Sequence, residues 1–140
     1  MPEVADERPV PPLPISTETS NPFWEGLREE QLRIQRCDRC ETWVYYPRSH
    51  CPACLSPSMT WRPVSGRGRL HSFTVAHQPT APHFADLVPQ LIGIVQLEEG
   101  PRLTTTLVDV DPDDLRVDLE VVAVFDHVDD EHTLLRYRPA

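Results

Sequence analysis

A chain of 140 residues accommodates one ordinary domain or two small modules, which excludes a large multidomain enzyme. The formal net charge of -9 argues against a protein whose whole surface neutralises phosphates, and sixteen prolines against five glycines disfavour long helices. No apolar run approaches the roughly 20 residues of a membrane span, and the acidic N-terminus lacks the features of a signal peptide. We therefore expect a soluble, β-rich protein of the reducing cytoplasm, with no contact to membranes.

Charge is distributed unevenly along the chain. Residues 33–69 carry seven arginines against two acidic residues, whereas residues 98–140 carry twelve acidic residues against four arginines. All thirteen basic residues are arginine, the side chain that forks onto phosphate and carboxylate oxygens. One end of the molecule is therefore able to attract an anion, although genome composition alone would also explain the bias towards arginine.

The N-terminal part predicts an arm followed by a short helix. Residues 1–20 are rich in proline and have no apolar periodicity, so they should form an extended arm. Asn21 as N-cap and Pro22 at the first helical position then predict a helix over residues 21–31.

One side of this expected helix is strongly apolar. Phe23, Trp24 and Leu27 share it, and the helix is too short to be stable alone. It must dock either on the chain's own ribbon or on a partner protein. The three side chains are therefore candidate residues of a partner interface.

Four cysteines follow in two pairs. Two residues separate the members of each pair, which lets a tight turn point both sulfurs at one ion, and ten residues separate the pairs. Short strands at 32–37 and 42–46 would frame them as a rubredoxin-like zinc ribbon. We expect one structural Zn²⁺ with no open coordination position, held by Cys37, Cys40, Cys51 and Cys54. Two disulfides, four buried thiols, or iron in place of zinc are the alternatives.

The second half predicts a five-stranded OB-fold barrel. Turn-rich residues 65–68 mark a module boundary, which divides the chain into an arm (1–20), a helix and ribbon (21–64) and a barrel (65–140). A small barrel of this kind closes on itself and so removes exposed sheet edges. The expected strands are 69–76, 90–97, 102–108, 120–126 and 133–137.

The sequence shows no catalytic motif. It has no nucleophile elbow, no phosphate-binding glycine loop and no fifth cysteine, so an independent enzyme is disfavoured. A nucleic-acid-binding OB-fold module is the main competing class, and it requires a basic groove with stacking aromatic residues. The acidic second half, in which the aromatic residues are Phe73, Phe84, Phe125 and Tyr137, argues against it.

Several segments in order resemble one known family. They are NPFWEGLREEQL, RIQRCDRC, YYPRSHCPAC, SGRGRLHSFTV, EEGPRLTTTLVDVDPDDL and the terminal RYRPA. Over about residues 11–140 the chain is similar to the zinc-ribbon/OB-fold proteins known as domain of unknown function 35. It departs from their pattern where Glu41 and Leu55 replace a frequent glycine after each cysteine pair, and where Asp118 begins a segment that is commonly Gly-Met-Pro.

The resemblance implies an accessory subunit of a thiolase-like acyl-CoA enzyme. Members of this kind are similar to the small partner in steroid side-chain retro-aldolases, where the thiolase-like subunit supplies the catalytic residues. Others accompany acyl-CoA hydratases or acyltransferases. We therefore expect a hetero-oligomer that meets acyl-CoA through the complex, with Arg67 and Arg69 as candidate contacts to coenzyme A phosphates.

Overall fold

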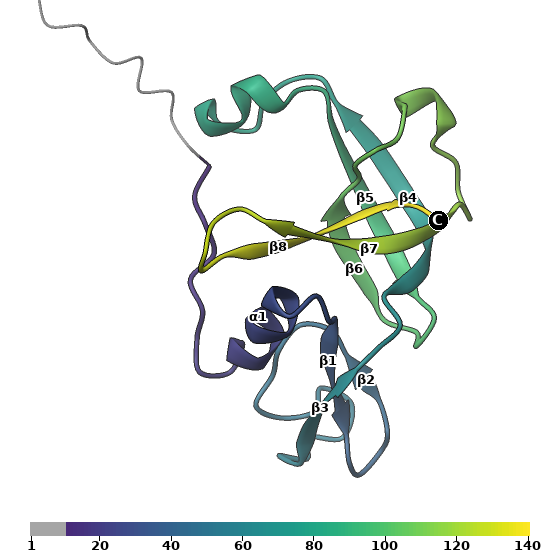
Figure 1. Ribbon diagram of the computed structural model, residues 1–140. Coiled ribbons are helices and arrows are strands. Elements are labelled where there is room, and N and C mark those ends of the chain that lie inside the picture. The colour runs from purple at the N-terminus through teal and green to yellow at the C-terminus, as the bar shows by residue number, and fades with distance from the viewer. Residues whose placement is uncertain (1–10) are drawn as a thin grey trace, which may run out of the picture.

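The computed structural model describes residues 11–140, so the first half of the expected arm lies outside the described residues. A short helix and a three-stranded sheet form one end of the molecule, and a five-stranded barrel forms the other (Figure 1). The expected fold class is confirmed, while the division into modules at residues 20 and 64 stays a prediction. Among the described helices, none has the length and apolarity needed to cross a membrane.

Helix α1 (Asn21–Arg28) has only two turns. The expectation that Asn21 caps this helix is wrong, because Ser20 occupies the N-cap position and no side chain bonds to the first turn. Pro22 lies within the first turn, where its missing N–H costs nothing because such groups have no acceptor inside the helix.

The helix also ends before the expected residue 31. Glu30 adopts a φ of 57°, and the Gln31 amide turns back to donate to the Gly26 carbonyl at 2.8 Å. This is a Schellman-type cap in which Glu30 takes the left-handed conformation usually given to glycine. Gly26 lies under the turn, where a Cβ would meet the Gln31 carbonyl oxygen at 2.7 Å.

The ribbon is a small sheet with strand order β2-β1-β3. Its central strand is β1 (Arg33–Cys37), and β2 is limited to Trp43–Val44. Strand β3 (Met59–Pro63) pairs with β1 over all five residues but was not expected, because Pro57 and Pro63 suggested a loop. Proline is tolerated there because β3 is an edge strand, whose outer side needs no donor.

The barrel is an antiparallel sheet in the order β6-β5-β4-β7-β8, the arrangement of an OB-fold. Val108 donates to the Tyr137 carbonyl at 2.8 Å and nearly closes the barrel between β6 and β8. All five expected strands are present, with ends that differ by two residues at most. The elements are β4 (Arg67–Ala76), η1 (Pro82–Leu87), β5 (Gln90–Leu97), β6 (Arg102–Thr106), η2 (Pro112–Asp114), β7 (Glu120–His127) and β8 (Thr133–Pro139).

One hydrophobic core connects the two ends. Leu27 is 0% exposed, and with Phe23 it joins Ile34 of β1 to Leu70 and Tyr137 of the barrel in a single buried cluster. Helix α1 accordingly packs on β1, β7 and β8. The helix is therefore held by its own chain, on both the ribbon and the barrel.

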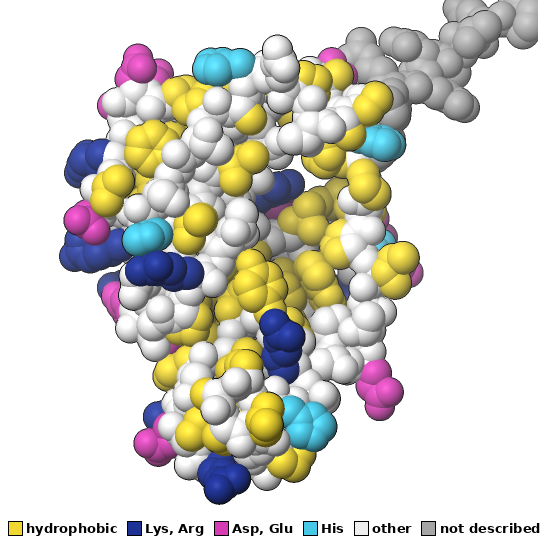
Figure 2. Space-filling model, turned by 180° about the vertical axis from the view of Figure 1, so that it is seen from behind, with side chains coloured by type: hydrophobic (Ala, Val, Ile, Leu, Met, Phe, Trp, Pro, Cys, Tyr) yellow, Lys and Arg dark blue, Asp and Glu magenta, His cyan; other side chains and the backbone are white. Residues whose placement is uncertain are grey.

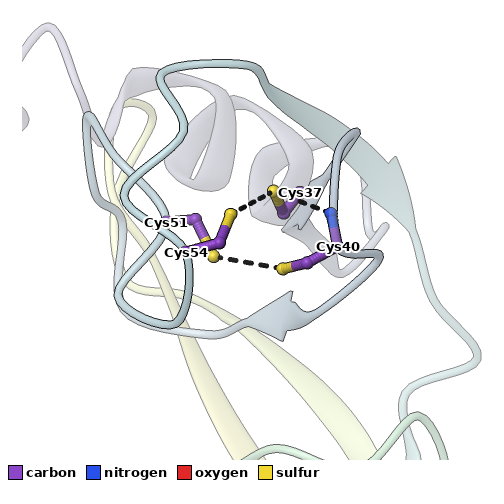
Figure 3. A group of neighbouring side chains, drawn as sticks. All are labelled: Cys37, Cys40, Cys51 and Cys54. Carbon is purple, nitrogen blue, oxygen red and sulfur yellow. Dashed lines mark hydrogen bonds between the residues drawn. The ribbon is translucent and has the colours of Figure 1, made fainter.

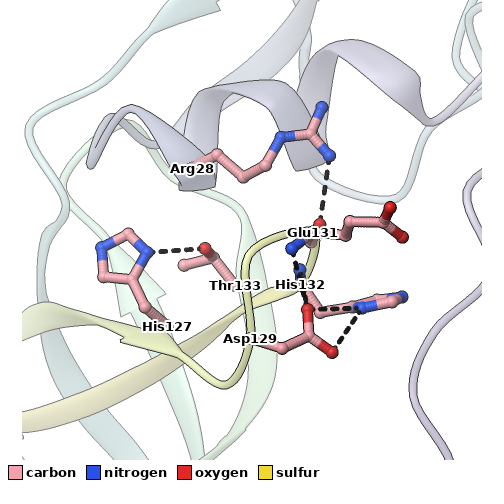
Figure 4. A network of polar contacts seen from close by, with 6 residues as sticks. All are labelled: Arg28, His127, Asp129, Glu131, His132 and Thr133. Carbon is pink, nitrogen blue, oxygen red and sulfur yellow. Dashed lines mark hydrogen bonds and ion pairs between the residues drawn. The ribbon is translucent and has the colours of Figure 1, made fainter.

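Polar contacts fasten the end of α1 to the hairpin between β7 and β8 (Figure 4). Arg28 Nη1 donates to the Glu131 carbonyl at 3.2 Å. His127 Nε2 lies 3.4 Å from Glu30 Oε1, and its Nδ1 lies 2.8 Å from the Thr133 hydroxyl. Because the side chains of His127 and Glu30 are 46% and 66% exposed, their contact orients the hairpin more than it stabilises it.

Gly68 marks a very close approach between β4 and β5. A Cβ at this position would lie 2.5 Å from the Gln96 carbonyl oxygen and 2.7 Å from Val95 Cγ1. The strands would have to separate, so we expect Gly68→Ala to lower the free energy of unfolding by about 1–3 kcal/mol. Urea denaturation measures the change, and an unaltered midpoint would show that the barrel yields here at no cost.

Candidate functional site

The four cysteines converge at one point of the ribbon, on two turns (Figure 3). The Sγ atoms of Cys37 and Cys54 are 3.6 Å apart, those of Cys40 and Cys51 are 3.5 Å apart, and all four lie within 4.8 Å of one another. A disulfide requires about 2.05 Å, whereas four thiolates bonded to zinc at about 2.3 Å place their sulfurs about 3.8 Å apart. The geometry therefore fits a bound metal ion and does not fit two disulfides.

The two turns have the same backbone, and we call them the first knuckle (37–42) and the second knuckle (51–56). In each, the amide of the first cysteine donates to a carbonyl five residues later, at 2.9 Å in both cases. Glu41 and Leu55, which follow the second cysteine, donate back to the first cysteine's carbonyl at 3.0 and 2.8 Å. Their φ angles are 63° and 64°, so glycine would fit both positions without strain.

The surroundings of the thiols favour the thiolate at Cys37 and Cys40 and disfavour it at Cys54. The Thr42 hydroxyl and amide lower the pKa of Cys40 to about 6, and the Cys40 amide lowers the pKa of Cys37. At Cys54 the Ser56 amide lowers the pKa, but desolvation and the neighbouring thiols outweigh it and raise the pKa to about 11. A cation at the centre of the four sulfurs would favour the thiolate at every cysteine, because thiolate is the form that coordinates metals.

Gln35 is a site residue that the sequence did not reveal. It is 4% exposed, and its side-chain amide donates to the Arg48 carbonyl at 2.8 Å while accepting from the Arg48 amide at 2.7 Å. The pair ties β1 to the loop between the knuckles and so fixes their relative position. A lone glutamine in a short strand carries no pattern that predicts this role.

The three candidate interface residues have different environments. Phe23 (7% exposed) and Leu27 (0%) are buried in the chain's own core, so they hold the helix in place. Trp24 is partly exposed and lines a groove of about 420 Å³, together with Phe84 of η1 and Leu135 of β8. Figure 2 shows hydrophobic side chains in a hollow between the barrel and the ribbon end. Phe23 also lines this groove, but Trp24 is the most exposed of the three, and contact of these residues with a partner stays a prediction.

Arg67 and Arg69 line a second cavity, of about 700 Å³, with Glu98 and Arg138. Arg69 Nη2 lies 3.1 Å from Glu120 Oε1, which offsets its charge. Arg67 has no carboxylate at ion-pair distance within residues 11–140. The cavity is thus of mixed charge, and contact of these arginines with coenzyme A phosphates stays a prediction.

Two models of known protein families match this chain, one over the ribbon and the other over the barrel. The family model described as "ChsH2, rubredoxin-like zinc ribbon domain" matches residues 24–60, and "ChsH2, C-terminal OB-fold domain" matches residues 61–126. A "DUF35 domain-containing scaffold protein" of Methanothermobacter thermautotrophicus is 35% identical over 118 residues, covering 84% of this chain and 88% of that protein. The chain belongs to the ChsH2/DUF35 family. The resemblance found in the sequence is thereby confirmed.

Two further ChsH2/DUF35 relatives differ in how much of them this chain covers. A "Probable enoyl-CoA hydratase alpha subunit" of Thermomonospora curvata is 39% identical over 121 residues, covering 86% of this chain but only 37% of that protein. The structure described as "Ltp2-ChsH2(DUF35) aldolase" has a TM-score of 0.79 at 34% identity, covering 90% of this chain and 98% of that chain. The chain thus corresponds in length to the aldolase component and to little more than a third of the hydratase subunit.

Proposed function

We propose that this chain is a non-catalytic, partner-stabilising subunit of a thiolase-like acyl-CoA enzyme complex. We further propose that the complex is a retro-aldolase that cleaves a β-hydroxyacyl-CoA, with a steroid side chain as the candidate acyl group. The observation that carries this proposal is the mutual coverage of 90% and 98% with the ChsH2 chain of the aldolase. The much longer hydratase subunit makes a hydratase partner the weaker alternative, ahead of an acyltransferase.

The chemistry of the described side chains supports a non-catalytic role. Within residues 11–140, the four cysteines form the one group of three or more histidine, cysteine, aspartate or glutamate side chains that lie close enough together to hold a metal ion. Four sulfur ligands leave no position for water or substrate, so we propose a structural Zn²⁺, with iron as the alternative. The reactive groups for thioester cleavage would then come from the partner.

The barrel gives little support to a nucleic-acid-binding role. Tyr137 is 0% exposed and forms part of the core, so it cannot stack on a base. Phe73 is 37% exposed, whereas Phe84 and Phe125 are partly buried, and neighbouring carboxylates would repel a phosphate backbone. Absence of nucleic-acid binding stays a prediction, which a titration with labelled oligonucleotides would test.

A cleavage assay tests the proposed function. This chain, its cognate thiolase-like subunit and their co-expressed complex are each incubated with a β-hydroxyacyl-CoA, and a shorter CoA ester with a ketone or aldehyde is sought. We expect turnover only with the complex. Turnover by this chain alone would contradict the non-catalytic role, and hydration of an unsaturated acyl-CoA by the complex would favour the hydratase alternative.

A further inference from the structure

The two knuckles present opposite surfaces on the same backbone. The hydrogen bonds of their backbone amides have nearly equal lengths, and the positive φ angles are nearly equal. Both sequences therefore meet the requirements of metal binding equally well. The first knuckle exposes charged side chains, and the second exposes apolar ones. The exposed residues are Asp38, Arg39 and Glu41 in the first knuckle, and Pro52, Ala53 and Leu55, followed by Pro57, in the second.

Leu55 is unfavourable twice over in the isolated chain. Its side chain is 74% exposed, so it gains almost nothing from the hydrophobic effect. Its φ of 64° places a γ-branched residue in the left-handed region, which costs free energy that glycine would avoid. Folding and metal binding therefore do not account for leucine at this position, whereas burial against another surface would.

The ribbon around this knuckle carries unpaired positive charge. Arg39 of the first knuckle and Arg48 of the loop between the knuckles are exposed, and within residues 11–140 neither has a carboxylate at ion-pair distance. Figure 2 shows hydrophobic, arginine and histidine side chains at the ribbon end of the molecule, with acidic side chains among them. An apolar tip with exposed guanidinium groups on the same ribbon is complementary to an apolar pocket with a carboxylate rim.

We propose that the second knuckle, with Leu55 as its anchor, docks into an apolar pocket rimmed by carboxylates on the thiolase-like partner. This inference rests on the proposed function, because it assumes that such a subunit is bound. The knuckle is already rigid in the free chain, held by the cysteine cluster and by the bonds between Gln35 and Arg48. Little ordering free energy is then lost on docking.

Two substitutions of Leu55 separate docking from folding. Leu55→Gly removes the anchor and also the strain of a side chain at positive φ. Leu55→Asn removes the anchor but keeps a side chain, on a residue that tolerates the left-handed conformation. We expect either change to raise the Kd for the purified thiolase-like subunit about 10- to 100-fold, the range for burial of one leucine side chain. The melting temperature and metal content should stay equal or rise.

Glu41→Gly is the matched control, because it relieves the same strain at the equivalent position of the first knuckle. It should not raise the Kd, because it leaves the apolar tip intact and removes a carboxylate that lies 4.0 Å from Arg36 Nη2. The wild-type Kd should also rise with salt concentration if the guanidinium groups face carboxylates.

The outcomes are distinct. Wild-type affinity in both Leu55 variants would overturn the docking proposal while leaving the proposed function intact. A change in the self-association of this chain alone, measured by light scattering, would show that the knuckle faces a second copy and would also overturn it. If the wild-type chain fails to bind the thiolase-like subunit, the proposed function itself fails, and the knuckle proposal falls with it.

Discussion

Replacing Cys51 with serine is expected to abolish metal binding and to unfold the ribbon. Cys51 is 0% exposed and its sulfur lies 3.5 Å from that of Cys40, so a serine hydroxyl would leave the ion with three thiolates. At structural zinc sites the binding free energy, about 10–16 kcal/mol, is also folding free energy. Because α1 packs on β1, loss of the ribbon should also release the helix.

Metal analysis together with far-UV circular dichroism measures this effect. One metal ion per wild-type chain should be lost in Cys51→Ser, and prolonged chelation of the wild-type protein should give the same spectrum. His50→Ala is the control, because the neighbouring imidazole is exposed and lies outside the cysteine cluster. Stoichiometric metal and an unchanged melting curve in Cys51→Ser would contradict a four-cysteine site.

The second large effect is expected for Leu27→Ala. Leu27 is 0% exposed and belongs to the cluster that joins the ribbon, helix and barrel. Truncation of a fully buried leucine removes its transfer free energy and leaves a cavity, so the free energy of unfolding should fall by about 2–5 kcal/mol. Equilibrium denaturation measures the loss.

Trp24→Ala is the comparison for Leu27→Ala on the same helix. Trp24 is only partly buried and lines the open groove, so its loss should lower stability less than the loss of Leu27. If the groove contacts the partner, Trp24→Ala should weaken assembly by about 2–4 kcal/mol, as aromatic anchors commonly do. Equal losses of stability in the two variants would show that the helix does not pack as described.

Local chemistry made much of the fold predictable from the sequence. Two Cys-x2-Cys pairs define a metal site, and alternating apolar residues between turn signals located all five barrel strands. Strand β3 was missed because a proline such as Pro63 is excluded from a central strand but tolerated in an edge strand. The sequence alone does not tell which kind of strand a segment forms. The early end of α1 depends on Glu30 taking a left-handed conformation without being glycine.

Three departures from the family's residue pattern fall where the backbone is left-handed. Glu41, Leu55 and Asp118 replace glycines of the family pattern, and all three have positive φ, at 63°, 64° and 68°. Glycine would adopt these φ angles without strain. A non-glycine residue at such a position is strained. Where its side chain does not stabilise the fold, the strain supports a hypothesis that the residue has a function.

The candidate site was less predictable because it depends on contacts distant in sequence. Helical spacing showed that Phe23, Trp24 and Leu27 share a side, but not which of them the chain itself buries. Arg69 suggested an anion site until the structure placed Glu120 of the neighbouring strand 3.1 Å away. The periodicity of a sequence shows which side chains share a face of a helix or strand. The tertiary fold decides which charged side chains lie opposite one another on neighbouring strands.

Co-purification shows whether this chain works as a partner subunit. Tagged chain and untagged thiolase-like subunit are co-expressed, captured through the tag, and sized by chromatography with light scattering. We expect one species that contains both chains in fixed stoichiometry and survives washing at low salt. Separate elution of the two chains, with the thiolase-like subunit fully active on its own, would contradict it.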